Sequence, residues 1–220
     1  YTAAIHSDNP EYAAAQEKNI PMLTRAQLLG EIMKHYDNSI AVAGTHGKTT
    51  TSSMISQILL EGPKDPTLSI GGIFKAINSN IHVGNSDLFL TEACEYTNSF
   101  LQLYAKYSVI LNVEAEHLDF FKDINDIRKS FHQFAADTKA DGAVVINNEI
   151  PDYQELVEGI KAKVITVGFD EAADYHAADI TYDETGEARF RVVGFGKDLG
   201  EIVLSVPGRH NVGNALAAIA

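Results

Sequence analysis

A glycine-rich turn between a short apolar stretch and a helical pattern carries the strongest chemical signal in this sequence. Residues 40–43 are apolar, residues 44–50 read Gly-Thr-His-Gly-Lys-Thr-Thr, and apolar residues then recur at helical spacing until Gly62-Pro63. Backbone N–H groups of such a turn point inward and, with the positive end of the helix dipole, form a nest for phosphate oxygens. Lys48 can reach the β- and γ-phosphates of a nucleotide, and the Thr49 hydroxyl can bind Mg²⁺. We therefore predict a phosphate-binding loop at residues 44–50.

This loop departs from the commonest phosphate-binding pattern. That pattern has a glycine five residues before its second glycine, where this chain has Val42. The shorter G-x-x-G-K-T form argues against ordinary kinases and GTPases. Residues 138–141 read Thr-Lys-Ala-Asp and match the guanine-reading motif of GTPases, but they precede a predicted strand instead of following one. We assign them to a turn at the end of a helix.

An acidic residue follows the apolar run Leu88-Phe89-Leu90, which is typical of a buried parallel strand. Ligands of doubly wound sheets bind at the carboxyl edge of the strands, so Glu92 is expected beside the phosphate-binding loop. Phosphate-transferring proteins keep a further Mg²⁺ contact at such a position. Glu92 is therefore predicted to bind the metal together with Thr49, and Glu95 is the alternative ligand. The structural alternative is that Glu92 is only a solvated carboxylate at the end of a strand.

The next predicted strand, residues 107–113, runs into a cluster of polar residues. Residues 112–119 read Asn-Val-Glu-Ala-Glu-His-Leu-Asp, which places three carboxylates, an amide and an imidazole at the same edge of the sheet. Carboxylates packed this closely repel one another unless a cation compensates them. His117 is therefore predicted to bind a second metal ion. His46, inside the loop, can contact phosphate or a substrate carboxylate, or can simply brace the turn.

Two asparagines stand three residues apart near the end of the chain. Residues 207–215 read Pro-Gly-Arg-His-Asn-Val-Gly-Asn-Ala, and positions i and i+3 of a helix share a face. An asparagine side chain offers both a donor and an acceptor, which suits the N6 and N7 edge of adenine. Asn211 and Asn214 are therefore candidate adenine contacts, and helix capping by Asn211 is the structural alternative.

Composition excludes several classes of protein. The net charge is −13 and no block of Lys and Arg occurs, so a nucleic-acid surface is not expected. The lone Cys94 rules out an internal disulfide framework and fits a reducing compartment. No apolar run approaches the length of a membrane span and nothing resembles a signal peptide. We expect a cytoplasmic enzyme without membrane insertion.

The order of the predicted elements indicates the fold. Strands alternate with helices through the middle of the chain, which predicts an α/β fold with a doubly wound, mostly parallel sheet of the P-loop type. Short strands after Phe169 predict a small antiparallel β extension. Two helices are expected within residues 10–36, with Pro10 at a helix start and Thr24 as a cap. Residues 1–5 read as a strand, and residues 62–86 as a surface excursion over the site with short strand-like pieces at Ile70 and at 81–83. The remaining predicted elements are strands at 87–92, 143–147 and 164–167 and helices at 97–104, 124–138 and 152–159.

Taken together, the motifs resemble the Mur ligase family. The matching stretches are G-T-H-G-K-T-T at 44–50, T-E-A-C-E-Y at 91–96, L-N-V-E-A-E-H-L-D at 111–119 and G-R-H-N-V-G-N-A at 208–215. They occur in the family's order and span most of the chain. Two positions depart from the commonest family pattern, Cys94 where Asp is frequent and Glu116 in place of Asp.

The resemblance implies a three-domain protein of which this chain is a piece. Residues 1–37 would be the C-terminal part of an N-terminal UDP-sugar-binding domain, and the stretch from Asp8 to Glu11 resembles the end of that domain. Residues 38–220 would be the central ATP-binding domain, truncated at its C-terminal end. The C-terminal domain would be absent, so the isolated piece is expected to bind nucleotide weakly and to ligate nothing.

The resemblance also implies an activity. In the family, ATP phosphorylates a substrate carboxylate, and an amine attacks the acyl phosphate to form an amide. The motifs are most similar to those of the member that joins L-alanine to UDP-N-acetylmuramate in peptidoglycan-precursor synthesis. Carried over by position, Thr49 and Glu92 would hold the first Mg²⁺, His117 the second, Asn211 and Asn214 the adenine, and Asn112 would polarise the reacting groups. ATP would be cradled by Gly44, Thr45, His46, Gly47, Lys48, Thr49 and Thr50.

Two alternatives stay open at this point. A relative could add a preformed peptide to the same sugar, or act as a folylpolyglutamate-type ligase. A nucleotide-binding regulatory module would use ATP as a switch and need no carboxylate substrate. The polar cluster at residues 112–119 argues against the regulatory module.

Overall fold

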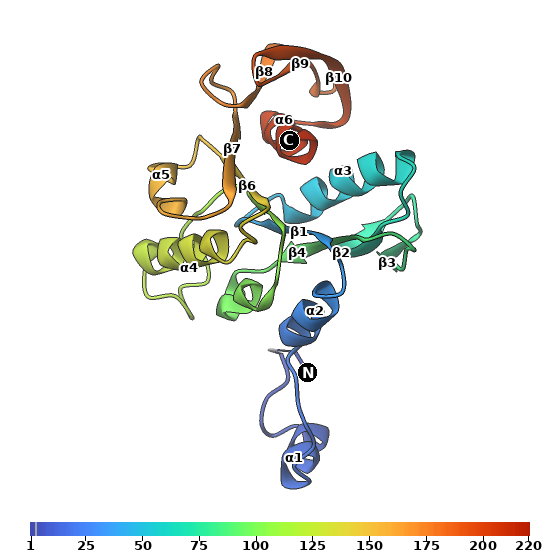
Figure 1. The fold of residues 1–220 in the computed structure, drawn as a ribbon, viewed down its shortest axis with the longest axis vertical. Helices are drawn as coiled ribbons and strands as arrows, with labels where there is room; N and C mark the ends of the chain where they lie inside the picture. Colours follow the sequence, from blue (N-terminus) through green and yellow to red (C-terminus); the bar gives the residue numbers. More distant parts are fainter. Residues whose placement is uncertain (3) are drawn as a thin grey trace.

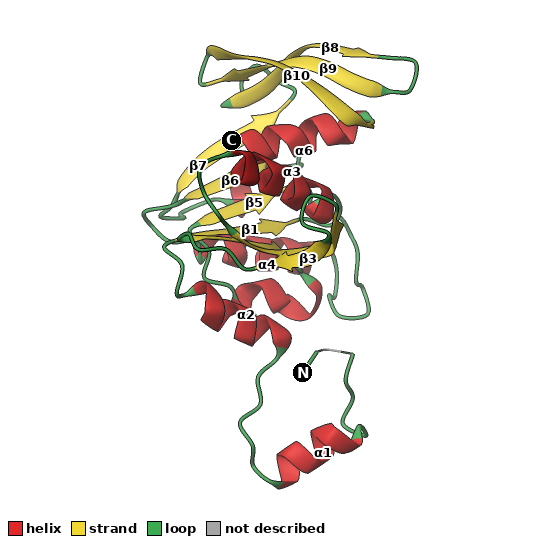
Figure 2. Ribbon diagram, turned by 90° about the vertical axis from the view of Figure 1, so that its right-hand side faces the viewer, coloured by secondary structure: helices red, strands yellow, loops and turns green. Residues whose placement is uncertain are grey.

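The first two helices lie outside the sheet. The computed structural model describes residues 1–2 and 4–220. Helix α1 (Pro10–Glu17) begins at Pro10 with Asn9 as its cap, and α2 (Arg25–Met33) begins after Thr24, whose hydroxyl and Gln27 form a capping box. Both predicted helices are confirmed. Figures 1 and 2 show α1 away from the body of the molecule, with α2 lying between it and the sheet.

The strand predicted at residues 1–5 is wrong for the described residues of that stretch. None of them is in a strand. The backbone of Tyr1 instead pairs with the start of α2, because the Arg25 N–H donates to the Tyr1 carbonyl at 2.7 Å. An apolar run alone predicts a strand only where a neighbouring strand can pair with it.

In the described part of the chain, ten strands form one mixed sheet in the order β10-β9-β8-β7-β6-β5-β1-β4-β2-β3. In this order, each neighbouring pair between β2 and β8 is parallel. The pairs β2–β3, β8–β9 and β9–β10 are antiparallel. The predicted mostly parallel sheet with an antiparallel extension is confirmed. The strands are β1 (Asn38–Ala43), β2 (Thr67–Phe74), β3 (Ser79–His82), β4 (Leu88–Ala93), β5 (Tyr107–Ile110), β6 (Ala143–Asn147), β7 (Lys163–Gly168), β8 (Tyr175–Tyr182), β9 (Glu187–Gly194) and β10 (Lys197–Pro207).

Helices cover both faces of the sheet (Figure 2). On one face, α3 (Lys48–Glu61) and α6 (Arg209–Ile219) pack against each other and over an apolar core that includes Val42, Leu90 and Leu216. The other face carries α2, the 3₁₀-helix η1 (Tyr96–Gln102), α4 (Ile124–Ala136) and α5 (Tyr153–Leu156), over a core that contains Phe100 and Phe131. Burial on both faces explains why the central strands are almost continuously apolar.

The antiparallel strands β8 to β10 extend the sheet beyond α6. Ala188, Phe190 and Val192 of β9 belong to the same apolar core as α6, so the helix is covered by the extension on one side and by α3 on the other. Figure 2 shows α6 in this position, directly beneath β8, β9 and β10. The extension therefore fixes the helix that carries the two candidate asparagines.

The strand-like pieces predicted at Ile70 and at 81–83 overlap β2 and β3, but both belong to the sheet, so residues 62–86 are not a separate surface excursion. Strand β2 pairs in parallel with β4, and β3 adds an antiparallel edge strand. Leu68 and Ile70 of β2 are buried in the core beneath α3. The small and polar residues thus lie on a strand at the margin of the sheet, where only part of one face needs to be apolar.

Several further elements differ from their predicted extent, among them the helix predicted at 152–159, which is only the short α5 (Tyr153–Leu156). Strand β5 ends at Ile110, three residues before the predicted end at 113, so the polar cluster begins in loop. The predicted helix at 97–104 is the 3₁₀-helix η1, in which Thr97 and Asn98 have left-handed backbone angles (φ 55° and 56°). The sequence predicts that Phe100 and Tyr104 both face inward. Phe100 is fully buried, whereas Tyr104 is 44% exposed. No helix among the described residues has the length and apolar character that crossing a bilayer requires.

The close approach of α2 to η1 gives a stability prediction. A Cβ added at Gly30 in α2 would lie 1.9 Å from the Gln102 carbonyl oxygen, so Gly30→Ala must push the two helices apart. Overpacking of this kind costs about 1–3 kcal/mol. We expect the free energy of unfolding, measured with urea, to fall by that amount in Gly30→Ala.

Gly213→Ala in α6 is the matched control. A Cβ there meets only a ring carbon of Phe169 at 3.8 Å, which is ordinary contact. Alanine is the better helix former by about 1 kcal/mol. The control is expected to unfold at the same or a higher urea concentration, and equal losses in the two variants would contradict the interpretation.

Candidate functional site

The phosphate-binding loop lies at the point where the direction of the strand order changes. Strand β1 pairs with β4 on one side and β5 on the other, and the loop leaves its carboxyl end. Ligands of open α/β sheets bind in the crevice at such a point. Gly47 has φ +85° and lies directly before α3, whose first turn receives no side-chain cap at that residue. The loop therefore offers the free N–H groups of a helix N-terminus at this edge.

Lys48 is held against the loop by three groups. Its Nζ donates to the Gly44 carbonyl at 2.5 Å, to the Thr45 carbonyl at 3.2 Å and to the Glu95 carboxylate (Oε2) at 3.0 Å. Glu95 is only 3% exposed, so its charge needs a partner, which Lys48 provides. The ammonium group therefore lies between the backbone carbonyls of the loop and the Glu95 carboxylate.

Thr49 and Glu92 are in direct contact. The Thr49 hydroxyl donates to Glu92 Oε2 at 3.1 Å, and the Gly71 N–H of β2 donates to Glu92 Oε1 at 2.6 Å. The two residues predicted to share a metal ion thus present a hydroxyl and a carboxylate side by side. The segment predicted to be a surface excursion supplies the group that orients the carboxylate.

Asn112 fastens the loop to the end of β5. Its Oδ1 accepts from the His46 N–H at 2.7 Å, and its Nδ2 donates to the His46 carbonyl at 3.0 Å. The Thr45 hydroxyl accepts from the Glu114 N–H at 2.9 Å on the same segment. Both ends of the Asn112 amide are engaged, so this geometry favours bracing the loop over the predicted polarisation of reacting groups. The His46 side chain stays largely exposed, with Nε2 3.8 Å from Glu114 Oε2.

His117 lies next to the same carboxylate that holds Lys48. Its Nε2 is 3.7 Å from Glu95 Oε1 and 4.0 Å from Glu116 Oε2. Single ligand atoms of Glu95, Glu116 and His117 all lie within 4.8 Å of one another, close enough to share a cation. Glu95 entered the sequence argument only as an alternative to Glu92. The two carboxylates in fact occupy different places, Glu92 beside Thr49 and Glu95 between Lys48 and His117.

Asn211 and Asn214 share a face of α6, as their spacing predicts, but their amides bind within the protein. The Asn214 amide donates to Asn211 Oδ1 at 3.0 Å, and Asn211 Nδ2 donates to the Pro207 carbonyl at 2.7 Å. Asn214 also lies against the loop, because a Cβ added at Gly47 would sit 2.7 Å from Asn214 Oδ1. Asn214 therefore contacts the phosphate-binding loop.

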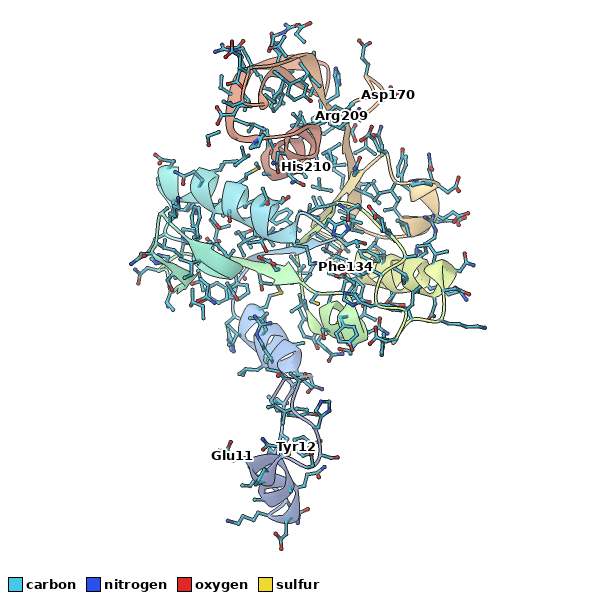
Figure 3. The ribbon with its side chains drawn as sticks, turned by 180° about the vertical axis from the view of Figure 1, so that it is seen from behind. Glu11, Tyr12, Phe134, Asp170, Arg209 and His210 are labelled. Atoms are coloured by element: carbon cyan, nitrogen blue, oxygen red, sulfur yellow. The ribbon has the colours of Figure 1, made fainter. Side chains whose placement is uncertain are left out.

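A cavity of about 140 Å³ opens beside Asn214. Sequence reasoning missed Asn147, Val167 and Phe169 among its lining residues, since these three lie outside the motifs that the sequence shows. Arg209 comes directly before His210, which lines the cavity. The guanidinium carbon of Arg209 lies 3.8 Å from the centre of the Phe169 ring, a cation–π contact. Figure 3 shows Arg209 and His210 together at the start of α6. The lining residues include Leu111, Asn147, Val167, Phe169, His210 and Gly213.

The contact between Gly47 and Asn214 predicts a position-specific loss of stability. Alanine at Gly47 must adopt a left-handed backbone, which costs about 1–2 kcal/mol, and must also displace the Asn214 amide. Gly159→Ala is the matched control, because Gly159 has φ +69° but nothing within 4 Å of an added Cβ. We expect Gly47→Ala to lower the free energy of unfolding clearly more than Gly159→Ala does. Indistinguishable losses would mean that Asn214 does not restrain the loop.

Comparison with known proteins places this geometry in a family. The model described as "Mur ligase middle domain" matches residues 42–220, and the model described as "Mur ligase family, catalytic domain" matches residues 1–37. A relative from Agathobacter rectalis, named UDP-N-acetylmuramate–L-alanine ligase, is 61% identical over all of this chain and 48% of its own length. The chain thus spans about half the length of the curated relatives it matches.

Solved structures agree. The crystal structure of UDP-N-acetylmuramate-alanine ligase from Thermotoga maritima superposes with a TM-score of 0.83 at 29% identity, covering 99% of this chain and 49% of that one. The crystal structure of UDP-N-acetylmuramate:L-alanyl-γ-D-glutamyl-meso-diaminopimelate ligase from Neisseria meningitides gives a TM-score of 0.85 at 26% identity, covering 98% of this chain and 70% of that one. The chain belongs to the Mur ligase family.

Proposed function

We propose that this chain is the ATP-binding part of a ligase that joins L-alanine to the carboxylate of UDP-N-acetylmuramate. The observation that carries the proposal is the convergence of Lys48, the Thr49–Glu92 pair and His117 at one edge of the sheet. The 61% identity to a relative of that name supports the choice of substrates. A cytoplasmic setting fits ATP as a substrate and a single free thiol, Cys94.

The domain division follows from the same reasoning. We assign residues 1–37 to the C-terminal part of a UDP-sugar-binding domain and residues 38–220 to the central ATP-binding domain. The separate matches of two family models to residues 1–37 and 42–220 support a boundary before β1. The N-terminal and C-terminal domains of the complete protein would supply the sugar nucleotide and amino-acid contacts.

The triphosphate would lie over the phosphate-binding loop. Backbone N–H groups of the loop and the start of α3 would donate to phosphate oxygens. Lys48 would exchange the Gly44 and Thr45 carbonyls, which accept its N–H groups at 2.5 and 3.2 Å, for oxygens of the β- and γ-phosphates. The carboxylate of Glu95 would keep the ammonium group charged and oriented.

The residues present fit Mg²⁺. Oxygen donors suit this ion, and the Thr49 hydroxyl and Glu92 carboxylate already lie 3.1 Å apart, so both can turn to one cation. We assign the second ion to His117, with Glu95 and Glu116 as the neighbouring carboxylates. Bound cations would neutralise the repulsion between the substrate carboxylate and the γ-phosphate.

The proposed reaction has two steps. A carboxylate oxygen of the sugar substrate attacks the γ-phosphorus, the bond from that phosphorus to the bridging oxygen breaks, and ADP leaves. The amine of alanine then attacks the acyl carbon, the C–O bond to phosphate breaks, and an amide and inorganic phosphate form. Lys48 stabilises the negative charge that develops on the transferred phosphoryl group.

The nucleobase is assigned to the cavity beside Asn214, which has about the size of a single ring system. Phe169 and Gly213 offer apolar surface there, while Asn147 and His210 offer polar atoms. Because the Asn211 amide is bound to Pro207 and Asn214, we propose that these two asparagines shape the adenine site and hold Gly47. Asn112 is assigned the same supporting role for His46.

Activity of the complete enzyme tests the proposed function. Phosphate release from ATP is measured with UDP-N-acetylmuramate and one candidate amine substrate at a time. The candidates are a panel of amino acids and the tripeptide L-alanyl-γ-D-glutamyl-meso-diaminopimelate, and we expect release to depend on L-alanine. Lys48→Ala in the same enzyme should lower turnover by about three orders of magnitude or more, with unchanged far-UV circular dichroism. A response to the tripeptide alone would favour the peptide-adding alternative. Full turnover in Lys48→Ala would remove that residue from the mechanism.

His117 should affect catalysis more than nucleotide binding. His117→Ala removes a group that faces Glu95 and Glu116 and leaves the phosphate-binding loop intact. We therefore expect kcat to fall about 100-fold, while the Kd for ATP changes by less than about threefold. His35→Ala, at an exposed position after α2, is the control and should change neither. Equal losses in kcat and ATP affinity would contradict the assignment of His117 to a second ion.

A further inference from the structure

Tyr96 contacts the loop that carries His117 through both its ring and its hydroxyl group. Its ring centroid lies 4.7 Å from that of His117, with the ring planes tilted by 35°. Its hydroxyl donates to the Asp119 carboxylate at 2.8 Å. Tyr96 is the first residue of η1, which follows the end of β4 at Ala93 after a short link. A single side chain thus ties the loop to the sheet at residues 117 and 119.

The loop needs such a tie, because His117 has a costly backbone. Its φ is +55°, in the left-handed region that disfavours residues with a Cβ. Its carbonyl accepts from the N–H groups of Phe120 and Phe121, both at 2.9 Å, which makes a tight turn. Residues held in this region persist only where their surroundings fix them.

Burial of the loop's own side chains does not fix it fully. Phe121 is buried, but Leu118 is 60% exposed and Phe120 is 44% exposed. The main contacts on the imidazole itself come from two consecutive residues after β4. Glu95 approaches Nε2 at 3.7 Å, and the Tyr96 ring packs beside the imidazole ring.

We propose that Tyr96 is a positioning residue that aims the His117 imidazole at Glu95 and so sets the second metal site. This inference rests on the proposed function for its catalytic consequence, but its geometric content stands on the contacts alone. The tyrosine ring packed at a tilt beside the imidazole fixes its orientation, and the hydroxyl holds the turn through Asp119. Hydrogen bonding to the Asp119 carboxylate also raises the pKa of the Tyr96 phenol, so the donor stays protonated at neutral pH.

The geometry is tested first in the complete enzyme without metal. With ¹³C-labelled histidine, the ring protons of His117, assigned from their loss in His117→Gln, should show the shift that a neighbouring aromatic ring produces. Tyr96→Phe should keep most of that shift, because the ring remains. Tyr96→Leu should abolish it. An unchanged His117 shift in Tyr96→Leu would overturn the proposal.

The metal consequence is tested by kinetics. Loss of a group that orients a metal ligand typically costs about 10- to 100-fold in metal affinity or activity. We expect the Mg²⁺ concentration for half-maximal rate to rise at least about tenfold in Tyr96→Leu, with a smaller rise in Tyr96→Phe and little change in the KM for ATP. Tyr182→Leu on β8, where the tyrosine is 47% exposed, is the matched control and should behave like the parent enzyme.

A double-variant cycle separates positioning from general stability and stays informative if Tyr96→Leu fails to fold. Tyr96→Phe and Asp119→Ala remove the same hydrogen bond, so the double variant should lose no more than either single one. Additive losses, or lower thermal stability with an unaltered Mg²⁺ requirement, would overturn the proposal. The two proposals fail separately. If the parent enzyme has no ligase activity but Tyr96→Leu still abolishes the His117 shift, the proposed function is overturned and the positioning role of Tyr96 stands.

Discussion

Concentrated negative charge at the carboxyl edge of the sheet is the constraint on which the site depends. Glu95 is almost completely buried and would be costly without a cation. Lys48 at 3.0 Å supplies the charge, and the His117 imidazole lies 3.7 Å from the other oxygen. This one carboxylate therefore links the phosphate-binding loop to the polar cluster after β5. The −13 net charge of the chain makes such local compensation necessary wherever acids converge.

The phosphate-binding loop is held in place by hydrogen bonds between side chains and backbone groups. Asn112 binds both the backbone N–H and the backbone carbonyl of His46, and the Thr45 hydroxyl accepts from the Glu114 N–H. On its other side the loop touches Asn214 of α6, which the antiparallel strands cover. Catalytic loops gain from such support, because a preorganised nest loses less entropy when phosphate binds. The β8–β10 extension thus acts on the site through α6.

The sequence predicts this architecture well where hydrophobic periodicity and turn chemistry agree. The strand at 143–147 has its predicted bounds, and α3 ends before Gly62 as expected. Only the strand-like piece at Ile70 could be predicted for β2, and not its full extent, because Gly71 and Gly72 interrupt the apolar pattern and the burial of the strand comes from pairing with β4. Non-local pairing also explains the error at residues 1–5, because none of the described residues of that stretch pairs with a strand.

The site shows the same division between local and non-local information. The motif spacing predicts that Thr49, Glu92 and His117 lie at one edge, and the structure brings them together there. The roles of the amides could not be predicted, because a residue type does not reveal its partners. Asn112 and Asn211 each use both ends of the amide on the protein's own backbone or on a neighbouring side chain. Buried amides must be satisfied, and only the folded chain shows by what.

The register of β4 explains how one strand can serve several parts of the site. Ala43 pairs with Ala93 and Val42 with Glu92 in parallel register. Leu90 faces the core under α3 while Phe89 and Ala93 face the other core, so alternation puts Glu92 on the α3 side, where Thr49 begins the helix. A slip of one residue would send Glu92 to the opposite face. After Ala93 the chain leaves the sheet, and Glu95 and Tyr96 turn instead toward Lys48 and His117. Strand pairing therefore sets the spacing between the two proposed metal positions, and the residues that follow the strand set their orientation.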